Sequence, residues 1–273
     1  RRARPLPRYV SQRIPLFHPD LPVILMWSQK SGCTTVAKWF FDQVGLLDEA
    51  LAHSSWVHRY EQEVYKRRPR YRRAVETALE SGEYEVVKVV RDPAVRAASA
   101  FLVLAEPGAL KSHHWAHGHW DVVDAWLAER GRAREDGISF VEHLEMLEAL
   151  GANGERINHH LTPQHVPGEE AVVQKTVRIE DFEAWAADFC ERHGRRPTDF
   201  GRIANSHHHH TVTDDWASRL GEAPETYRFR QGECSDMRFP SARALINERS
   251  LPAVRRYYGA DMRRYGELYP VPA

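Results

Sequence analysis

The hydrophobic pattern predicts two buried β-strands, each followed by a helix. Five apolar residues follow Pro22 in LPVILMWS without polar alternation, which is typical of a parallel strand covered on both faces. EYEVVKVVRDP contains four valines and ends at Pro93, which predicts a second strand. Apolar positions then recur at helical spacing in TTVAKWFFDQVGLL and AVRAASAFLVLA. Two strand–turn–helix units predict an α/β fold with a central parallel sheet flanked by helices.

The rest of the chain is predicted to be mainly helices and loops. Residues 48–83 are predicted to be a loop and then a solvated helix, and residues 106–120 a long loop. The segment 171–194 has the pattern of a short strand leading into a helix. Further helices are predicted in 120–131, 139–151 and 241–266, a loop in 158–168 and irregular structure in 206–239.

No repeat and no domain boundary is visible. The first 19 residues carry four prolines and no periodicity, so we expect an extended arm on the surface. The sequence therefore predicts an N-terminal arm over residues 1–20 and one domain over residues 21–273.

Charge and cysteine content restrict the possible partners. Lys plus Arg and Asp plus Glu both number 38, which gives no general reason to expect a nucleic-acid polymer or an acidic membrane. The three cysteines are widely spaced, which favours a reducing compartment over a disulfide framework. The longest apolar window, 21–27, is too short to span a membrane, and we expect a soluble protein. The chain begins without Met, so a longer chain with an upstream anchor stays open.

The loop WSQKSGCTT has the side chains of a phosphate site. A helix start presents unpaired backbone N–H groups and the positive end of the helix dipole. Gly32 lets the backbone approach a ligand, Lys30 adds a cation, and Thr34 and Thr35 add hydroxyl donors. The spacing differs from the triphosphatase loop GxxxxGK[ST], because Lys30 precedes Gly32. The simpler alternative is a capped turn with an incidental lysine.

The second strand ends in another candidate anion site. Arg91 closes the strand and Ser99 follows eight positions later, since 99 − 91 = 8. If the helix begins near Pro93, Ser99 lies about two turns into it and can face the same anion as the guanidinium. The arginine fork fits phosphate with two hydrogen bonds. Alternatively, Arg91 pairs with Asp92 or another carboxylate, and Ser99 is a packing residue.

Together these two stretches resemble the sulfotransferase superfamily, which transfers sulfonate from 3′-phosphoadenosine 5′-phosphosulfate to an acceptor hydroxyl or amine. QKSGCTT is similar to that family's 5′-phosphosulfate loop, PK-x-G-x-[ST], except that Gln29 replaces the usual Pro. VVRDPAVRAASAF is similar to its 3′-phosphate stretch, R-[DEN]-P followed by Ser and an aromatic residue. The resemblance implies a P-loop-like central parallel β-sheet in a single domain.

Two further stretches favour the carbohydrate sulfotransferase branch and its bacterial relatives. HLTPQH followed by VVQKTVRIEDFEAW is similar to the pattern H-W-x-P-Q … V-G-K-x-E-x-L-E-E-D. VRRYYGADMRRYG is similar to the terminal Y-x-x-D-F-x-x-F-G-Y. The acceptor is then a glycan or another hydroxylated molecule, whereas residues 101–157 and 190–250 match no pattern that would identify it.

The resemblance also implies a mechanism of in-line sulfonate transfer without a metal, with adenosine 3′,5′-bisphosphate as the product. Lys30 would stabilise the bridging oxygen to the 5′-phosphate. Arg91 and Ser99 would bind the 3′-phosphate, far from the reacting centre. The residues predicted to contact the nucleotide are Lys30, Ser31, Gly32, Cys33, Thr34, Thr35, Arg91 and Ser99.

Histidine is the predicted general base, because its ordinary pKa is close to neutral pH. His58, in WVHRYEQ, is the first choice because this stretch resembles V-H-x-x-L-P of the carbohydrate branch. His53 and Glu61 are the second choices.

Three other stretches have more than one interpretation. HHWAHGHW can be a polar loop, a metal site, or an acceptor groove in which Trp115 and Trp120 stack on sugars. The simplest explanation is a polar loop, and the same holds for SHHHHT at 206–211. The basic run 66–73 is a solvated helix face or contacts an anionic acceptor.

Two other function classes stay open. A P-loop kinase-like phosphotransferase would need ATP and Mg²⁺, and a catalytically silent module would bind the nucleotide only. The expected location is the cytoplasm for a bacterial protein, or the Golgi lumen if a longer chain carries an anchor. The sequence does not indicate an oligomeric state.

Overall fold

The computed structural model describes residues 7–11, 13–106, 114–151, 157–204, 211–212, 216–234 and 238–269. Its contacts divide the chain into two compact units, each made of two segments. The first unit comprises Arg1–Arg91 and Gln164–His207, and the second comprises Asp92–Pro163 and His208–Ala273. A compact unit is not necessarily a domain that folds by itself. The single domain predicted over residues 21–273 therefore stays a prediction.

The first unit contains a three-stranded parallel sheet. Strand β1 (Val23–Trp27) pairs with β2 (Glu85–Val90), which pairs with β3 (Lys175–Arg178). The strand order is β1-β2-β3, so β2 is central. All three strands were predicted, and the α/β class with a parallel sheet is confirmed.

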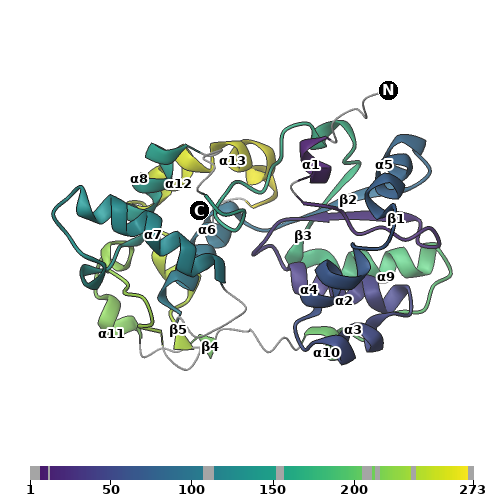
Figure 1. Cartoon of the computed structure of the whole chain (residues 1–273), viewed down its shortest axis with the longest axis horizontal. Helices are drawn as coiled ribbons and strands as arrows, with labels where there is room; N and C mark the ends of the chain where they lie inside the picture. Colours follow the sequence, from purple (N-terminus) through teal and green to yellow (C-terminus); the bar gives the residue numbers. More distant parts are fainter. Residues whose placement is uncertain are drawn as a thin grey trace. The chain divides into compact units, whose positions relative to one another are not determined.

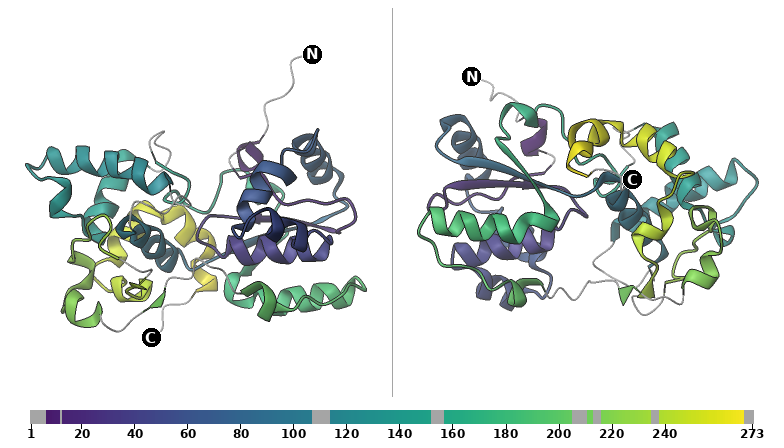
Figure 2. Two further views of the ribbon diagram at one scale, coloured as in Figure 1. Left: turned by 60° about the horizontal axis from the view of Figure 1, so that its bottom comes forward. Right: turned by 180° about the vertical axis from the view of Figure 1, so that it is seen from behind.

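Helices cover both faces of this sheet. Helices α1 and α5 lie on one side, and α2 and α9 lie on the other (Figure 1). Helix α2 runs beside α9 (Figure 2), and Trp39 packs against Phe182, Trp185 and Phe189 with ring centroids 5.4–5.7 Å apart. The helices of this unit are α1 (Arg8–Ser11), α2 (Cys33–Gln43), α3 (Leu47–His53), α4 (Val57–Tyr60), the π-helix η1 (Glu61–Tyr65), α5 (Tyr71–Ser81), α9 (Phe182–Arg192) and α10 (Phe200–Ala204).

The N-terminal segment is part of this core, and the prediction of an extended surface arm is wrong. Val10 and Leu16 are fully buried, and Leu16 forms an antiparallel bridge with Leu25 of β1. The Tyr71 hydroxyl accepts from the N–H of Phe17 and donates to the Pro15 carbonyl, both at 3.0 Å. Apolar residues between the prolines bury their side chains, and the segment includes the short helix α1.

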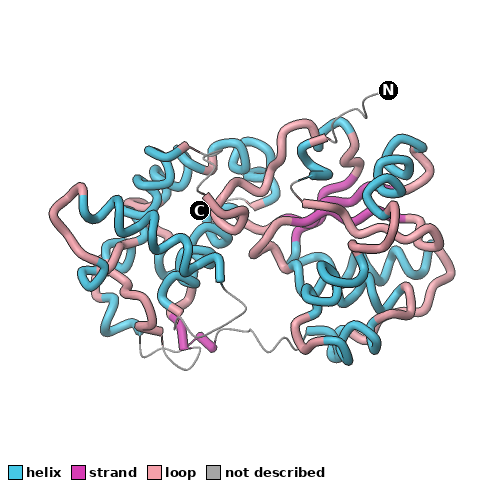
Figure 3. Tube along the Cα trace, in the orientation of Figure 1, coloured by secondary structure: helices cyan, strands magenta, loops and turns pink. Residues whose placement is uncertain are grey.

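The second unit consists mainly of helices and the loops that connect them (Figure 3). Asp92 caps α6 by accepting from Ala94 N and Val95 N, and Pro93 is the first helical residue, as predicted. A two-residue parallel pairing joins β4 (Thr211–Val212) and β5 (Arg238–Phe239). The helices are α6 (Pro93–Leu102), α7 (His114–Ala128), α8 (Phe140–Leu150), α11 (Trp216–Leu220), α12 (Leu251–Tyr257) and α13 (Gly259–Tyr265).

Two predicted loops contain helices. Helix α7 already begins at His114, because Ala116, Trp120, Val123 and Leu127 form one buried stripe despite the histidines and glycine between them. The predicted loop after residue 48 is occupied by α3, α4 and η1, which bury Ala50, Val57 and Tyr60. Among the described residues, no helix has the length and apolar character needed to cross a membrane.

Candidate functional site

The predicted phosphate loop connects β1 to α2 through two left-handed residues. The φ angles are 65° at Lys30 and 76° at Gly32. A Cβ on Gly32 would lie 2.1 Å from Ile179 Cδ1, so this position needs glycine for space as well as for conformation. Helix α2 starts at the next residue, Cys33, and the N–H groups of its first turn face the loop. The sharp turn thus directs a helix start toward the carboxyl end of β1.

Gln164 joins the ends of β1 and β2. Its side chain is fully buried; Oε1 accepts from Ser31 Oγ at 3.0 Å and from Arg91 N at 3.2 Å. Its Nε2 donates to the Arg91 carbonyl at 2.7 Å, and its own carbonyl accepts from Ser28 Oγ at 3.0 Å. One side chain therefore fixes the phosphate loop to the strand end that carries Arg91.

Charged side chains hold Gln164 in place through its backbone carbonyl. Lys88, in the middle of β2, donates to the Gln164 carbonyl at 3.0 Å and to Glu169 Oε2 at 2.7 Å, and both charged side chains are almost completely buried. Arg13, from the N-terminal segment, donates to the same carbonyl at 3.1 Å and to Ser28 Oγ at 2.6 Å. The site is thus fixed by residues from three distant parts of the sequence.

Lys30 and Arg91, the two predicted cationic residues of the nucleotide site, are neighbours. The Arg91 guanidinium donates from Nη1 to the Lys30 carbonyl at 3.2 Å. The alternative partner Asp92 uses its carboxylate to cap α6. Ser99, which is partly buried on α6, belongs to the second unit, and its predicted contact with the 3′-phosphate stays a prediction.

His58 lies at the start of α2. Its Nε2 is 3.3 Å from Thr34 Oγ1, in the first turn of that helix. On the other side of the ring, Nδ1–H donates to Glu61 Oε2 at 2.5 Å. His58 and Glu61 are three residues apart on consecutive helical turns, which places both side chains on one face. The structure thus brings the first-choice base to the phosphate loop, with Glu61 as its partner.

The charges in this cluster are strongly coupled. Burial disfavours imidazolium, but the negative charges of Cys33 and Glu61 outweigh it and raise the pKa of His58 to about 10. Burial likewise raises the pKa of Cys33, but His58 outweighs this effect and the net pKa is lowered. Burial also opposes ionised Glu61, whereas Lys66 and His58 lower its pKa to about 2. The favoured form is therefore a charged His58 beside an ionised Glu61.

Lys66 completes the cluster. Its Nζ lies 2.6 Å from Glu61 Oε1 and 4.5 Å from the centroid of the Trp27 ring, and it donates to the Ile14 carbonyl. The basic run is therefore divided: Lys66 supports the site, while the following arginines Arg67, Arg70, Arg72 and Arg73 are exposed. His53, the second-choice histidine, is exposed and lies 3.5 Å from Glu63 Oε2.

No family model, curated protein or solved structure matches this chain. The site therefore has to be interpreted from its own geometry.

Ala116, His119 and Trp120 of the histidine-rich stretch are buried. Trp120 is fully buried and donates its indole N–H to the Leu104 carbonyl at 2.9 Å, so the interpretation that it stacks on sugars is wrong. Trp115 stacks on His160 with centroids 4.4 Å apart. His119 and His143 are buried with Nε2 atoms 3.0 Å apart, and burial lowers the pKa of His119 to about 4. Residues 206–210 of the second histidine stretch lie outside the described residues.

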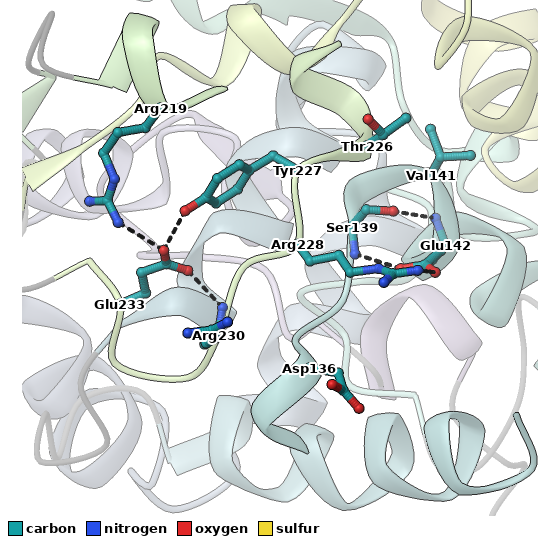
Figure 4. A pocket seen from close by; sticks show the side chains of 10 residues that line it. All are labelled: Asp136, Ser139, Val141, Glu142, Arg219, Thr226, Tyr227, Arg228, Arg230 and Glu233. Atoms are coloured by element: carbon teal, nitrogen blue, oxygen red, sulfur yellow. Dashed lines mark hydrogen bonds and ion pairs between the residues drawn. The ribbon is translucent and has the colours of Figure 1, made fainter. Parts of the chain in front are cut away.

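A separate cavity of about 810 Å³ lies within the second unit (Figure 4). Its Glu233 carboxylate accepts from Arg219 at 2.9 Å, Tyr227 at 2.5 Å and the N–H of Arg230 at 2.9 Å. Glu142 is bound by Arg228 at 3.1 Å. No sequence-predicted site residue lines it. In the described parts of the chain, no group of three metal-ligating side chains is arranged to hold a metal ion.

Three residues that contribute to the site were not identified from the sequence. Gln164 belongs to the family pattern that contains PQ, and this was the available signal, but the sequence assigns it no role. Cys33 was predicted only as a nucleotide contact, and the influence of His58 on its pKa has no signal in sequence spacing. Arg13 lies 15 residues from Ser28, in a segment without periodicity, so nothing indicated its contact.

Proposed function

We propose that the chain is a P-loop-like, 3′-phosphoadenosine 5′-phosphosulfate-dependent sulfotransferase that transfers sulfonate to a hydroxyl of a carbohydrate or other hydroxylated acceptor. The observation that carries this proposal is the hydrogen bond from Arg91 to the Lys30 carbonyl. It supports the proposal because a nucleotide with phosphates at both the 5′ and 3′ positions needs two neighbouring anion-binding elements. The missing triphosphatase spacing disfavours ATP as the ligand.

The loop residues have distinct roles in this proposal. The N–H groups of Ser31, Gly32, Cys33 and Thr34 hold the 5′-phosphate at the helix start, and the Thr35 hydroxyl adds a donor. Lys30 stabilises the negative charge that develops on the bridging oxygen as the S–O bond breaks. Arg91, with Ser99, binds the 3′-phosphate and supplies binding energy away from the reacting sulfur.

His58 takes the acceptor's proton as the general base in this proposal. Its Nδ1–H donates to Glu61, so Nε2, which lies 3.3 Å from Thr34 Oγ1, is the nitrogen that accepts the proton at the loop. Because its raised pKa favours the imidazolium, His58 acts as a base in its neutral form, whose share grows as pH rises toward 10. The acceptor oxygen attacks the sulfur of the sulfonate group, its proton passes to Nε2, and the bisphosphate leaves.

Ligand-induced thermal stabilisation tests the proposal. Adenosine 3′,5′-bisphosphate should raise the melting temperature, because a ligand bound only by the folded state stabilises it, whereas ATP with Mg²⁺ should not. Arg91→Ala should reduce the bisphosphate shift strongly, with the exposed Arg73→Ala as its matched control. Stabilisation by ATP with Mg²⁺ alone would contradict the proposal.

Turnover tests the role of Lys30. With labelled donor and a panel of sugar and phenol acceptors, Lys30→Ala should lower kcat by about 10²-fold or more while the bisphosphate still binds, because the lysine acts on charge that develops only in the transition state. Lys175→Ala, on the exposed start of β3, is the control. Bisphosphate binding without turnover of any acceptor would favour the silent nucleotide-binding module.

A further inference from the structure

The cavity of the second unit is built from three segments that lie far apart in the sequence. Its lining residues come from the region around the start of α8, from α11 and from the 3-10 helix η7 (Pro224–Thr226) with the loop that follows it. Its volume of about 810 Å³ is within the range of about 300–1,000 Å³ that is usual for sites of small ligands. The cavity is thus large enough to enclose much of a small organic molecule.

A close backbone contact holds two of these segments together. Ile138 and Phe229 exchange two backbone hydrogen bonds, both of 3.0 Å, and both side chains are buried. A Cβ on Gly137 would lie 2.7 Å from the Phe229 carbonyl oxygen, so the approach depends on glycine. Neighbouring side chains of an extended segment point to opposite sides, and the buried Phe229 therefore leaves Arg228 and Arg230 together on the exposed side.

The two central carboxylates of the cavity already have donors within the protein. Glu233 has the three donors described above. Glu142 accepts from Arg132 at 2.6 Å, from Arg228 at 3.1 Å and from the N–H of Ser139 at 3.0 Å. Burial opposes ionised Glu142, but these three donors outweigh it and lower its pKa. The carboxylates therefore position arginines and do not form an open site for a cation.

The arginines of the cavity, in contrast, keep unused donors. A guanidinium carries five N–H groups, and Arg219 and Arg228 each use one of them on a carboxylate of the cavity. The side chain of Arg230 makes no hydrogen bond or ion pair with any other residue that the structure describes. Figure 4 shows Arg219 and Arg230 on different sides of Glu233. Because donors are in excess, the cavity fits a ligand that supplies acceptors.

We propose that this cavity binds a small hydroxylated molecule that carries one carboxylate or sulfate group. The arginine fork matches two oxygens of such a group, and Arg230 is the arginine whose donors are all unused. The described residues that line the cavity include three arginines and three carboxylates, so a ligand with several negative charges is disfavoured. Asp136, Ser139 and Thr226 are the partners for the ligand's hydroxyl groups. This inference does not rest on the proposed sulfotransferase activity.

Isothermal titration with three probes of similar size tests the site. D-Glucuronate and D-glucose 6-sulfate should bind, and D-glucose should bind about tenfold or more weakly, because hydrogen bonds to a charged group are stronger than those to a neutral group. Tighter binding of glucuronate would assign the site to carboxylates, and tighter binding of the sulfate ester would assign it to sulfates. Failure of both anions to bind, or equal affinity for glucose, would overturn the proposal.

Substitution of Arg230 locates the bound anion. Arg230→Ala should lower the affinity for the anionic probes about tenfold or more, and the chain should still fold because this side chain is exposed. Arg230→Lys keeps the charge but loses the fork, so it should restore only part of the affinity. Arg243→Ala, at an exposed arginine that does not line the cavity, is the matched control and should keep the affinity. Equal losses in both alanine variants would show general attraction to surface charge and overturn the proposal.

Arg91→Ala separates this site from the nucleotide site. It should leave the affinity for glucuronate and glucose 6-sulfate unchanged, even where it reduces stabilisation by the bisphosphate. Loss of the anionic probes in Arg91→Ala but not in Arg230→Ala would place them at the nucleotide site and overturn this inference alone. Probe binding that depends on Arg230, in a chain that the bisphosphate does not stabilise, would support the cavity site and contradict the proposed function.

Discussion

At the scale of single residues, the phosphate loop depends on positions where one added atom would not fit. Gly32 has a left-handed backbone, and Ile179 occupies the space that a Cβ would need. Thr34, two residues later, has its hydroxyl 3.3 Å from Nε2 of His58. Motif spacing predicted the glycine, but spacing contains no information on a contact between residues 34 and 58.

Gly32→Ala should destabilise the chain by more than the conformational cost alone. A left-handed alanine costs about 1–2 kcal/mol, and overpacking against Ile179 should add about 1–3 kcal/mol. Gly82→Ala is the matched control, because its φ is 70° but nothing lies within 4 Å of the added Cβ. Urea unfolding measures both variants. Equal losses would show that Ile179 moves away without cost.

At the scale of elements, strand ends are held by side chains from distant loops. Gln164 bonds the end of β2 at Arg91, while Gln174 accepts from the N–H of Val86 near its start. The strands were predictable from their apolar runs, because burial on both faces removes polar alternation. The residue that links their ends was not, since any polar side chain in a loop gives the same local pattern.

Gln164→Leu should loosen the phosphate loop. It leaves the buried N–H and carbonyl of Arg91 without their side-chain partner, which should cost about 1–3 kcal/mol, and it should weaken bisphosphate binding at least tenfold. Gln174→Leu removes a comparable bond at the other end of β2 and should keep the affinity. Isothermal titration compares the two variants. Similar affinities for both would argue against Gln164 as the organiser of the loop.

The cap of α6 tests the alternative role of Asp92. Asp92→Ala removes the acceptor for Ala94 N and Val95 N, which should lower the free energy of unfolding by about 1 kcal/mol, whereas Asp92→Asn should keep most of it. Bisphosphate affinity should not change. If Asp92→Ala weakens the bisphosphate as much as Arg91→Ala does, the carboxylate acts on the ligand site and is more than a cap.

At the scale of the whole molecule, the Cys33–His58 pair couples folding to pH. The raised pKa of His58 gives stability that is complete below about 6.5, its unfolded value, and is lost as pH rises through about 10. The lowered pKa of Cys33 gives stability that is complete above its ordinary value of about 8.5 and is lost as pH falls through its folded value. The Cys33 contribution rises with pH and the His58 contribution falls, so the two oppose each other where these pH ranges overlap.

Cys33→Ser should remove the Cys33 contribution. It should also weaken the His58 contribution, because the charge of Cys33 is the larger of the two that raise the pKa of His58 against burial. Urea midpoints from pH 5.5 to 9.5 should therefore diverge between the two proteins above pH 6.5, while the effects of other groups cancel in the difference. Parallel curves would show that the charges of Cys33 and His58 are not coupled.

The sequence by itself determined the three parallel strands, the loop at Lys30 and Gly32 and the helix that starts at Pro93, because these depend on local apolar pattern, glycine conformation and proline geometry. It also indicated His58 through a family pattern. Only the tertiary structure decided that Gln164 and Arg13 organise the loop and that His58, Glu61 and Lys66 form one charged cluster. These contacts form when separate elements pack together, and their strength depends on burial, which no single segment specifies.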